Sequence, residues 1–161
     1  MLIPMEVIGV RVEMPSNQPI ILLKEIDGSR FLPIWVGAVE ATAIAFAQQG
    51  VEPPRPLTHD LMRHLLEVLQ VTLTEVQLTE IKEGIFYATM HLLDQSSQPL
   101  TLAARPSDAI ALALRTHSSI LASAELLSAV GVEMPVAEGE NQEVEKFREF
   151  LDQINPEDFA G

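Results

Sequence analysis

One stretch of the chain gathers ionisable side chains beside a rigid loop. Glu52, His59, Asp60 and Arg63 fall within or shortly after the proline-rich segment 52–56. His59 and Arg63 have the spacing of one helical turn, and a helix N-terminus after a stiff loop could present an anion site or a carboxylate ligand for a metal ion. The alternative is structural: Asp60 complements the helix dipole, and Arg63 lies on a solvated helix face.

A second candidate lies where a strand is predicted to end and a helix to begin. Arg105 and Asp108 flank Pro106 and Ser107 there, and such junctions often carry functional residues. Arg105 could bind a phosphate with two hydrogen bonds, while Asp108 could ligate a metal ion or orient Arg105. In the alternative interpretation Asp108 caps the helix and Arg105 forms a structural ion pair, because a helix this apolar is buried and its polar end must be satisfied.

Hydrolysis of a phosphodiester bond would use these residue types together. The reaction needs an activated water and positive groups that stabilise the charge of the transition state. The sequence holds no strong motif of a known nuclease mechanism, so the candidates rest on residue type and position. His64 is predicted on the wet face of a helix. His91 and His117 have no partner at a metal-ligand spacing and are predicted to be structural.

Composition limits the class of protein. The 161 residues suit one domain, and the lack of cysteine excludes disulfides and thiolate metal sites. The formal net charge of −13 argues against nucleic acid as a partner, since phosphate binding depends on Lys and Arg. However, residues 1–120 carry 13 acidic and 8 basic side chains, whereas residues 121–161 carry 10 and 2. The body of the chain is therefore only mildly acidic and leaves room for a local basic cleft.

No targeting segment is predicted. The first residues lack the basic and apolar regions of a signal peptide, and no apolar run approaches the length that spans a bilayer. We therefore expect a cytoplasmic protein with no membrane partner.

The elements that must position the candidate side chains follow from periodicity and turn residues. Alternating apolar residues and short turns predict strands at residues 5–14, 20–25, 31–36, 71–81, 85–93, 100–104 and 120–122. Helical spacing and capping residues predict helices at residues 38–49, 58–70, 107–116 and between Ser123 and Gly131. Because the strands come in runs joined by short turns, the predicted fold class is α+β, with a mixed, mainly antiparallel sheet and packed helices.

Two of these helices lead to expectations about packing. The helix at 38–49 is rich in alanine, and such small residues allow close approach of another element or of another subunit. The helix at 58–70 is amphipathic, so one stripe should face the core. The stripe predicted to be buried consists of Leu61, Leu65, Val68 and Leu69.

The character of the sequence changes after Pro135. Residues 137–143 form an acidic linker, and from Gln142 a last helix is predicted. Its apolar residues at seam spacing are Val144, Phe147, Leu151 and Ile154. The sequence thus predicts a domain at residues 1–136 and an acidic linker with a C-terminal helix at residues 137–161.

Four stretches of the sequence together resemble the bifunctional nuclease domain family. They are Phe31–Gly37 with Glu40 and Ala41, Gln49–Leu61, Gly84–Ala88 and Ala104–Ala113. The stretches follow the family's order and look closest to its short actinobacterial-type members. The resemblance implies a compact α+β domain that tends to oligomerise and a nuclease activity on both DNA and RNA. Residues 147–159 resemble a truncated or degenerate UVR motif, a short helical hairpin that follows the domain in many members.

Residues and resemblance together predict a nuclease that hydrolyses phosphodiester bonds in DNA and RNA, assisted by a divalent ion such as Mg²⁺ or Mn²⁺. The residues predicted to converge on its site are Glu52, His59, Asp60, Arg63, Arg105 and Asp108. We also expect a homo-oligomer. The alternative function is a non-catalytic oligomeric interaction module that uses the alanine-rich helix and the tail as contact surfaces. A small-ligand sensor is a third function, for which the sequence holds no fingerprint.

Overall fold

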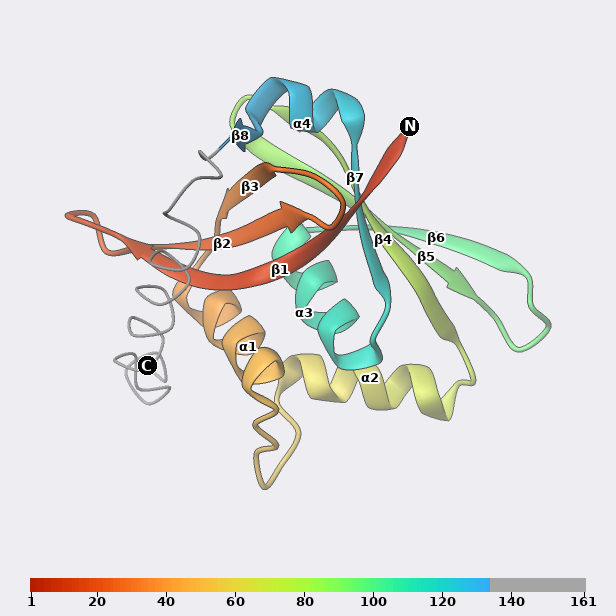
Figure 1. Ribbon diagram of the computed structural model, residues 1–161. Helices are drawn as coiled ribbons and strands as arrows, with labels where there is room; N and C mark the ends of the chain where they lie inside the picture. The colour runs from red at the N-terminus through yellow and green to blue at the C-terminus, as the bar shows by residue number, and fades with distance from the viewer. Residues whose placement is uncertain (134–161) are drawn as a thin grey trace.

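The computed structural model describes residues 1–133, which form eight strands and four helices (Figure 1). The strands are β1 (Leu2–Glu13), β2 (Gln18–Glu25), β3 (Arg30–Trp35), β4 (Thr72–Lys82), β5 (Ile85–Leu93), β6 (Pro99–Ala104), β7 (Ser119–Ser123) and β8 (Val132–Glu133). The helices are α1 (Ala38–Gln49), α2 (Thr58–Val68), α3 (Pro106–Thr116) and α4 (Ala124–Val130). The predicted domain boundary at residue 136 and the predicted C-terminal helix lie outside the described residues.

All eight strands lie in one sheet, in the order β6-β5-β4-β7-β1-β2-β3-β8. Neighbouring strands are antiparallel except β4 and β7, which are parallel. The runs β1–β3 and β4–β6 are built from hairpins between consecutive strands, and β7 joins the two runs by lying between β1 and β4. The predicted α+β class with a mixed, mainly antiparallel sheet is therefore confirmed, with β8 as a strand that the sequence pattern did not predict.

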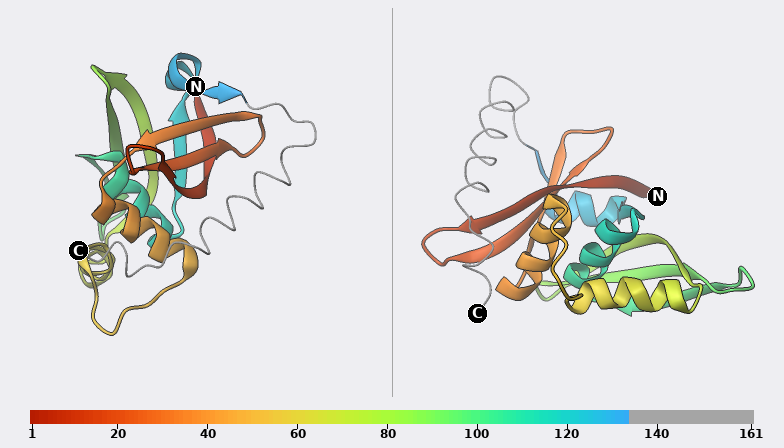
Figure 2. Two further views of the ribbon diagram at one scale, coloured as in Figure 1. Left: turned by 90° about the vertical axis from the view of Figure 1, so that its left-hand side faces the viewer. Right: turned by 90° about the horizontal axis from the view of Figure 1, so that it is seen from below.

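Helices α1, α2 and α3 gather on one side of the twisted sheet (Figure 2). Helix α3 is the most deeply buried of them, and its segment from Ala109 to Ala113 is at most 1% exposed. It packs against both α1 and α2. Because Ala41 and Ala43 of α1 are themselves buried, the alanines serve close approach inside the chain. No helix within residues 1–133 has the length and apolar character needed to cross a membrane.

The orientation of α2 differs from the prediction. The stripe expected to be buried is exposed: Leu61 by 53%, Leu65 by 51%, Val68 by 79% and Leu69 by 53%. Instead, His59 is buried, and Met62 and Leu66 pack partly buried against the core. The helix carries two apolar stripes at helical spacing, so periodicity alone does not choose between them. A long-range ion pair makes the choice.

That ion pair joins Arg115 of α3 to Asp60 of α2. The Arg115 side chain is only 5% exposed, and its Nε donates to Asp60 Oδ1 at 2.8 Å. Its terminal nitrogens donate to the carbonyl of Ala111 at 2.8 Å and to that of Ala43 in α1 at 3.0 Å. A buried guanidinium needs such partners, because an unpaired charge in the interior is costly. Arg115 therefore fixes α1, α2 and α3 relative to one another and holds Asp60 of α2 inward.

Replacing Arg115 by methionine should strongly destabilise the fold. We expect Arg115→Met to lower the free energy of unfolding by about 3 kcal/mol, because it leaves the largely buried Asp60 carboxylate without its partner. Urea denaturation followed by circular dichroism measures the change. The matched control is Lys82→Met, which removes an exposed ion pair with Glu80 and should cost at most about 1 kcal/mol. Equal stabilities of Arg115→Met and Lys82→Met would contradict the role given to Arg115.

Candidate functional site

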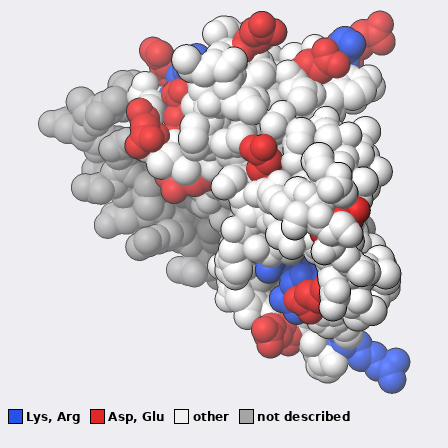
Figure 3. Space-filling view, turned by 90° about the vertical axis from the view of Figure 1, so that its right-hand side faces the viewer, with Lys and Arg blue, Asp and Glu red and all other residues white. Residues whose placement is uncertain are grey.

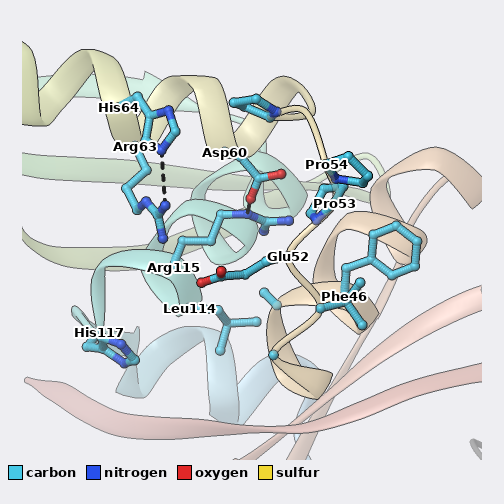
Figure 4. Close-up of a pocket in the computed structure, with 14 residues that line it drawn as sticks. Phe46, Glu52, Pro53, Pro54, Asp60, Arg63, His64, Leu114, Arg115 and His117 are labelled. Atoms are coloured by element: carbon cyan, nitrogen blue, oxygen red, sulfur yellow. Dashed lines mark hydrogen bonds and ion pairs between the residues drawn. The ribbon is translucent and has the colours of Figure 1, made fainter.

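A pocket of about 390 Å³ lies where α1 and α3 end and α2 begins (Figure 4). Gly50 caps the C-terminal end of α1, and its φ of 66° is the left-handed conformation that glycine adopts readily. The proline-rich loop that follows lines the pocket through Pro53, Pro54 and Pro56. Since proline restricts the backbone, this wall is stiff. The ionisable residues that line the pocket are Glu52, Asp60, Arg63, His64, Arg115 and His117.

Arg63 and His64 form a pair on the α2 side of this pocket. Arg63 Nη2 lies 3.1 Å from His64 Nε2, and Figure 4 shows the two side chains turned toward each other. A guanidinium can only donate, so His64 accepts at Nε2 and carries its proton on Nδ1. Arg63 Nε is buried and has no hydrogen-bond partner; the nearest acidic oxygen, of Glu67, is 3.7 Å away. The pocket wall thus holds a cationic group with an unused donor.

A second polar cluster lies beside the pocket, between α1, α2 and α3. His59 Nε2 is 2.9 Å from Asp108 Oδ1, and Arg105 Nε donates to Asp108 Oδ2 at 2.8 Å. Arg105 also reaches Glu40 Oε1 of α1 at 3.1 Å. Because a carboxylate only accepts, His59 donates from Nε2. We call Glu40, His59, Arg105 and Asp108 the helix-start network, since it joins the first turns of three helices.

The six residues predicted to converge fall into two neighbouring groups. His59, Arg105 and Asp108 meet in the helix-start network, although 49 residues separate His59 from Asp108. The pocket, by contrast, is lined by Glu52, Asp60 and Arg63. His59 and Asp60 are consecutive in the first turn of α2 and point to different groups.

Four further residues of these groups were not among the candidates. Arg115 stands at the end of an apolar helix, and a lone arginine there is itself a signal of a buried ion pair. His64 and His117 line the pocket, although the sequence pattern places the first on a wet face and gives the second no partner. Glu40 adds to the helix-start network, and no sequence signal distinguishes it from an exposed first-turn acid.

Both aspartates are held in their ionised forms by their partners. Burial on its own would raise the pKa of Asp108, but the hydrogen bonds from Arg105 and His59 outweigh it and hold that pKa below its ordinary value. Burial likewise opposes ionisation of Asp60, and the hydrogen bonds from Arg115 and the Leu57 amide bring its pKa below the ordinary value.

The same bonds decide how these aspartates fit a metal ion. Each oxygen of Asp60 and of Asp108 already accepts from a protein donor, which is a guanidinium, an amide or an imidazole. Within residues 1–133 no three His, Asp or Glu side chains come together as a metal site. The side chains present therefore do not fit a resident metal ion held by the protein alone.

Fold and site together define an α+β domain with a twisted mixed sheet, whose helix ends and one stiff loop enclose an ionisable pocket. The bifunctional nuclease domain matches residues 21–135, and the chain belongs to that family. Two uncharacterized proteins from two strains of Mycobacterium tuberculosis are similar to it, each 48% identical in an alignment of 160 residues that covers 95% of this chain and 95% of the relative. The family match begins after β1, but β1 pairs with β2 and β7 and belongs to the same folded unit.

The lowered pKa values of Asp60 and Asp108 predict how stability depends on pH. A carboxyl group whose pKa is lower in the folded state contributes stability above its unfolded pKa of about 3.9. That contribution is lost as the pH falls through the folded-state value. We expect Asp108→Asn to be less stable than the wild type by about 1 kcal/mol at neutral pH, since solvent weakens this part-exposed cluster. The difference should shrink below about pH 4.

Thermal unfolding of both proteins between neutral and acidic pH measures this difference. Asp27→Asn, in the exposed turn between β2 and β3, is the control for removing one negative charge. A stability difference for Asp108→Asn that stays constant down to acid unfolding would contradict the account of the helix-start network.

Proposed function

We propose that the protein is a nuclease that hydrolyses phosphodiester bonds of nucleic acid in the pocket between α1, α2 and α3. The observation that carries the proposal is the pairing of Arg63 with His64 in that pocket, which leaves the buried Arg63 Nε without an acceptor. A phosphate oxygen is an acceptor of the right charge and geometry for a guanidinium. Membership of the bifunctional nuclease domain family supports the same reaction class.

The composition of the pocket supports a site for anions in an otherwise acidic chain. It collects two of the four histidines and two arginines, and Arg55 lies in the loop between the lining residues Pro54 and Pro56. The negative charge of Asp60 is balanced by Arg115. Charge that develops on a phosphate in the transition state would meet Arg63 in a partly enclosed setting, where such stabilisation is largest.

Proton transfer would fall to His117 and Glu52 of the pocket, which can take a proton from the attacking group and return it to the leaving oxygen. With Nε2 accepting from Arg63, His64 is a neutral imidazole, and its Nδ1–H would stabilise charge on a phosphate or leaving oxygen by a hydrogen bond and not by giving up the proton. Glu52 and His117, both exposed, are the groups that would take a proton from the attacking water or hydroxyl. Asp60 and Arg115 act as positioning residues in this account, because their charges balance each other in a buried ion pair.

The helix-start network has a supporting role in the proposal. His59, Arg105 and Asp108 satisfy one another and hold the first turn of α2 against α3. Arg63 lies one helical turn after His59, so any shift of the first turn of α2 would also shift Arg63. These three residues, expected from sequence to be catalytic, are therefore assigned to positioning the pocket wall.

A non-catalytic interaction module is the second candidate function. The observation in its favour is the exposed apolar stripe of α2, which includes Leu61, Leu65 and Val68. Stripes of this kind often mark surfaces that bind another protein. The two functions can be told apart at the pocket, because the nuclease needs Arg63 and His64 and an interaction module needs neither.

Loss of the arginine–histidine pair should abolish cleavage. We expect Arg63→Gln and His64→Asn each to reduce the cleavage rate by about 100-fold, the usual effect of removing a donor that stabilises charge in the transition state. The assay follows fluorescent single- and double-stranded DNA and RNA, with Mg²⁺, with Mn²⁺ and with EDTA, so that any requirement for a divalent ion is measured directly.

Lys82→Gln, an exposed change at the end of β4, is the control and should cleave like the wild type. All variants are purified identically, so that a contaminating host nuclease would contribute the same rate to every preparation. A lower rate in Arg63→Gln or His64→Asn then belongs to the protein itself. Equal rates in the wild type, Arg63→Gln and His64→Asn would therefore remove the pocket from the mechanism. A wild type without cleavage under any condition would leave the interaction module as the better function.

A further inference from the structure

Strand β6 forms one outer edge of the sheet. Its six residues pair only with β5, and within residues 1–133 nothing pairs with its other side. An open edge presents unpaired amide and carbonyl groups, which is a template for another strand. At the opposite edge, β8 pairs with Arg30 and Phe31 of β3, and the remainder of β3 contains Pro33, which has no amide hydrogen to offer to another strand.

The apolar face of the sheet continues onto this open edge. Leu102 is the direct partner of Met90, and Leu100 is the direct partner of Leu92. Partners of this kind point to the same face of a sheet. Met90 and Leu92 are 4% and 8% exposed, whereas Leu102 and Leu100 are 54% and 47% exposed. The rest of the described chain therefore covers the apolar face of the sheet as far as β5 and leaves the apolar side chains of β6 exposed.

The edge also lacks the features that protect edge strands in monomers. Charged side chains, inward-pointing lysines and bulges normally block pairing with another chain. Residues 95–104 contain no Asp, Glu, Lys or Arg, and Pro99 stands only at the first position of β6. Figure 3, seen from the side toward which the β5–β6 hairpin extends in Figure 1, shows a broad uncharged area between separated charged groups.

We propose that β6 is a self-association surface, at which it pairs antiparallel with β6 of a second copy of this chain. A two-fold axis through the strand pair would join the two sheets into one and bring Leu100 and Leu102 of both copies onto one shared face. This inference does not depend on the proposed nuclease activity.

Charge favours a second copy over the chain's own C-terminal residues. The chain has a formal net charge of −13, so two copies repel unless they meet where acidic groups are absent, and the segment 95–104 is such a place. Residues 134–161 carry eight acidic and two basic side chains, a poor match for an uncharged edge.

Sedimentation of the full chain at micromolar concentration tests the surface. We expect a dimer for the wild type and an increase of about 100-fold or more in the dissociation constant for Leu102→Glu, which places two like charges at the contact. The matched control is Leu61→Glu on α2, since Leu61 is 53% exposed and Leu102 is 54% exposed. Leu61→Glu should remain a dimer.

Cysteine cross-linking gives a second readout that does not rely on a destabilising charge. The chain contains no cysteine, so a single cysteine can form a disulfide only with another copy. The four single variants are Leu100→Cys, Thr101→Cys, Leu102→Cys and Ala103→Cys. We expect oxidation to link the two copies fastest in the variant whose cysteine lies nearest the two-fold axis, because there the two Cα atoms come within disulfide range. Val39→Cys, an exposed position on α1, should not cross-link.

Three outcomes would overturn the inference. The first is a wild type that stays monomeric at every concentration. This is the result expected if residues 134–161 of the same chain, and not a second copy, cover the edge. The second is a dimer that dissociates with Leu61→Glu and persists with Leu102→Glu, which would place the contact on α2. The third is the absence of a disulfide-linked dimer at all four β6 positions.

Discussion

The structure depends above all on one buried arginine. Arg115 donates to Asp60 of α2 and to the carbonyls of Ala43 in α1 and Ala111 in α3. A guanidinium this deeply buried is tolerated only while these acceptors stay in place, so the three helices are fixed as a set. The rotation of α2 follows, because Asp60 must face Arg115. With Asp60 inward, Arg63 and His64 come to line the pocket and the leucine stripe is left outside.

Much of the fold follows from local signals in the sequence. Alternation and short turns place β1 to β7 close to their observed bounds, because a hairpin is specified by residues that are near in sequence. The order of hairpins also predicts a mainly antiparallel sheet. The face of α2 could not be predicted in the same way. Its leucine stripe and its Met62 and Leu66 stripe have the same spacing, and the partner that decides between them is 55 residues away.

The candidate site shows the same division between local and distant information. Residue type and position mark Glu52, Asp60 and Arg63 correctly as neighbours of one loop, and all three line the pocket. The contact between His59 and Asp108 joins segments 49 residues apart, and the sequence supplies no signal for it beyond two polar residues at helix starts. His117 is missed for a related reason, since it enters the pocket only because α3 ends there in a left-handed residue with φ of 55°.

The distribution of charge partners is compatible with the phosphate site that we propose in this acidic chain. An anion near Asp60 and Asp108 would be repelled if their charges were free, but each carboxylate is matched by an arginine and by a further donor. The aspartates that look catalytic in the sequence therefore hold helices together. They stay ionised, and their negative charges are balanced by the arginines that bind them. Arg63 differs, because its Nε has no hydrogen-bond partner among the described residues and its ion pair with Glu67 is long, at 3.7 Å. In the function that we propose, the chemistry therefore falls to the pocket residues outside the buried Asp60–Arg115 pair, which are Arg63, His64, His117 and Glu52.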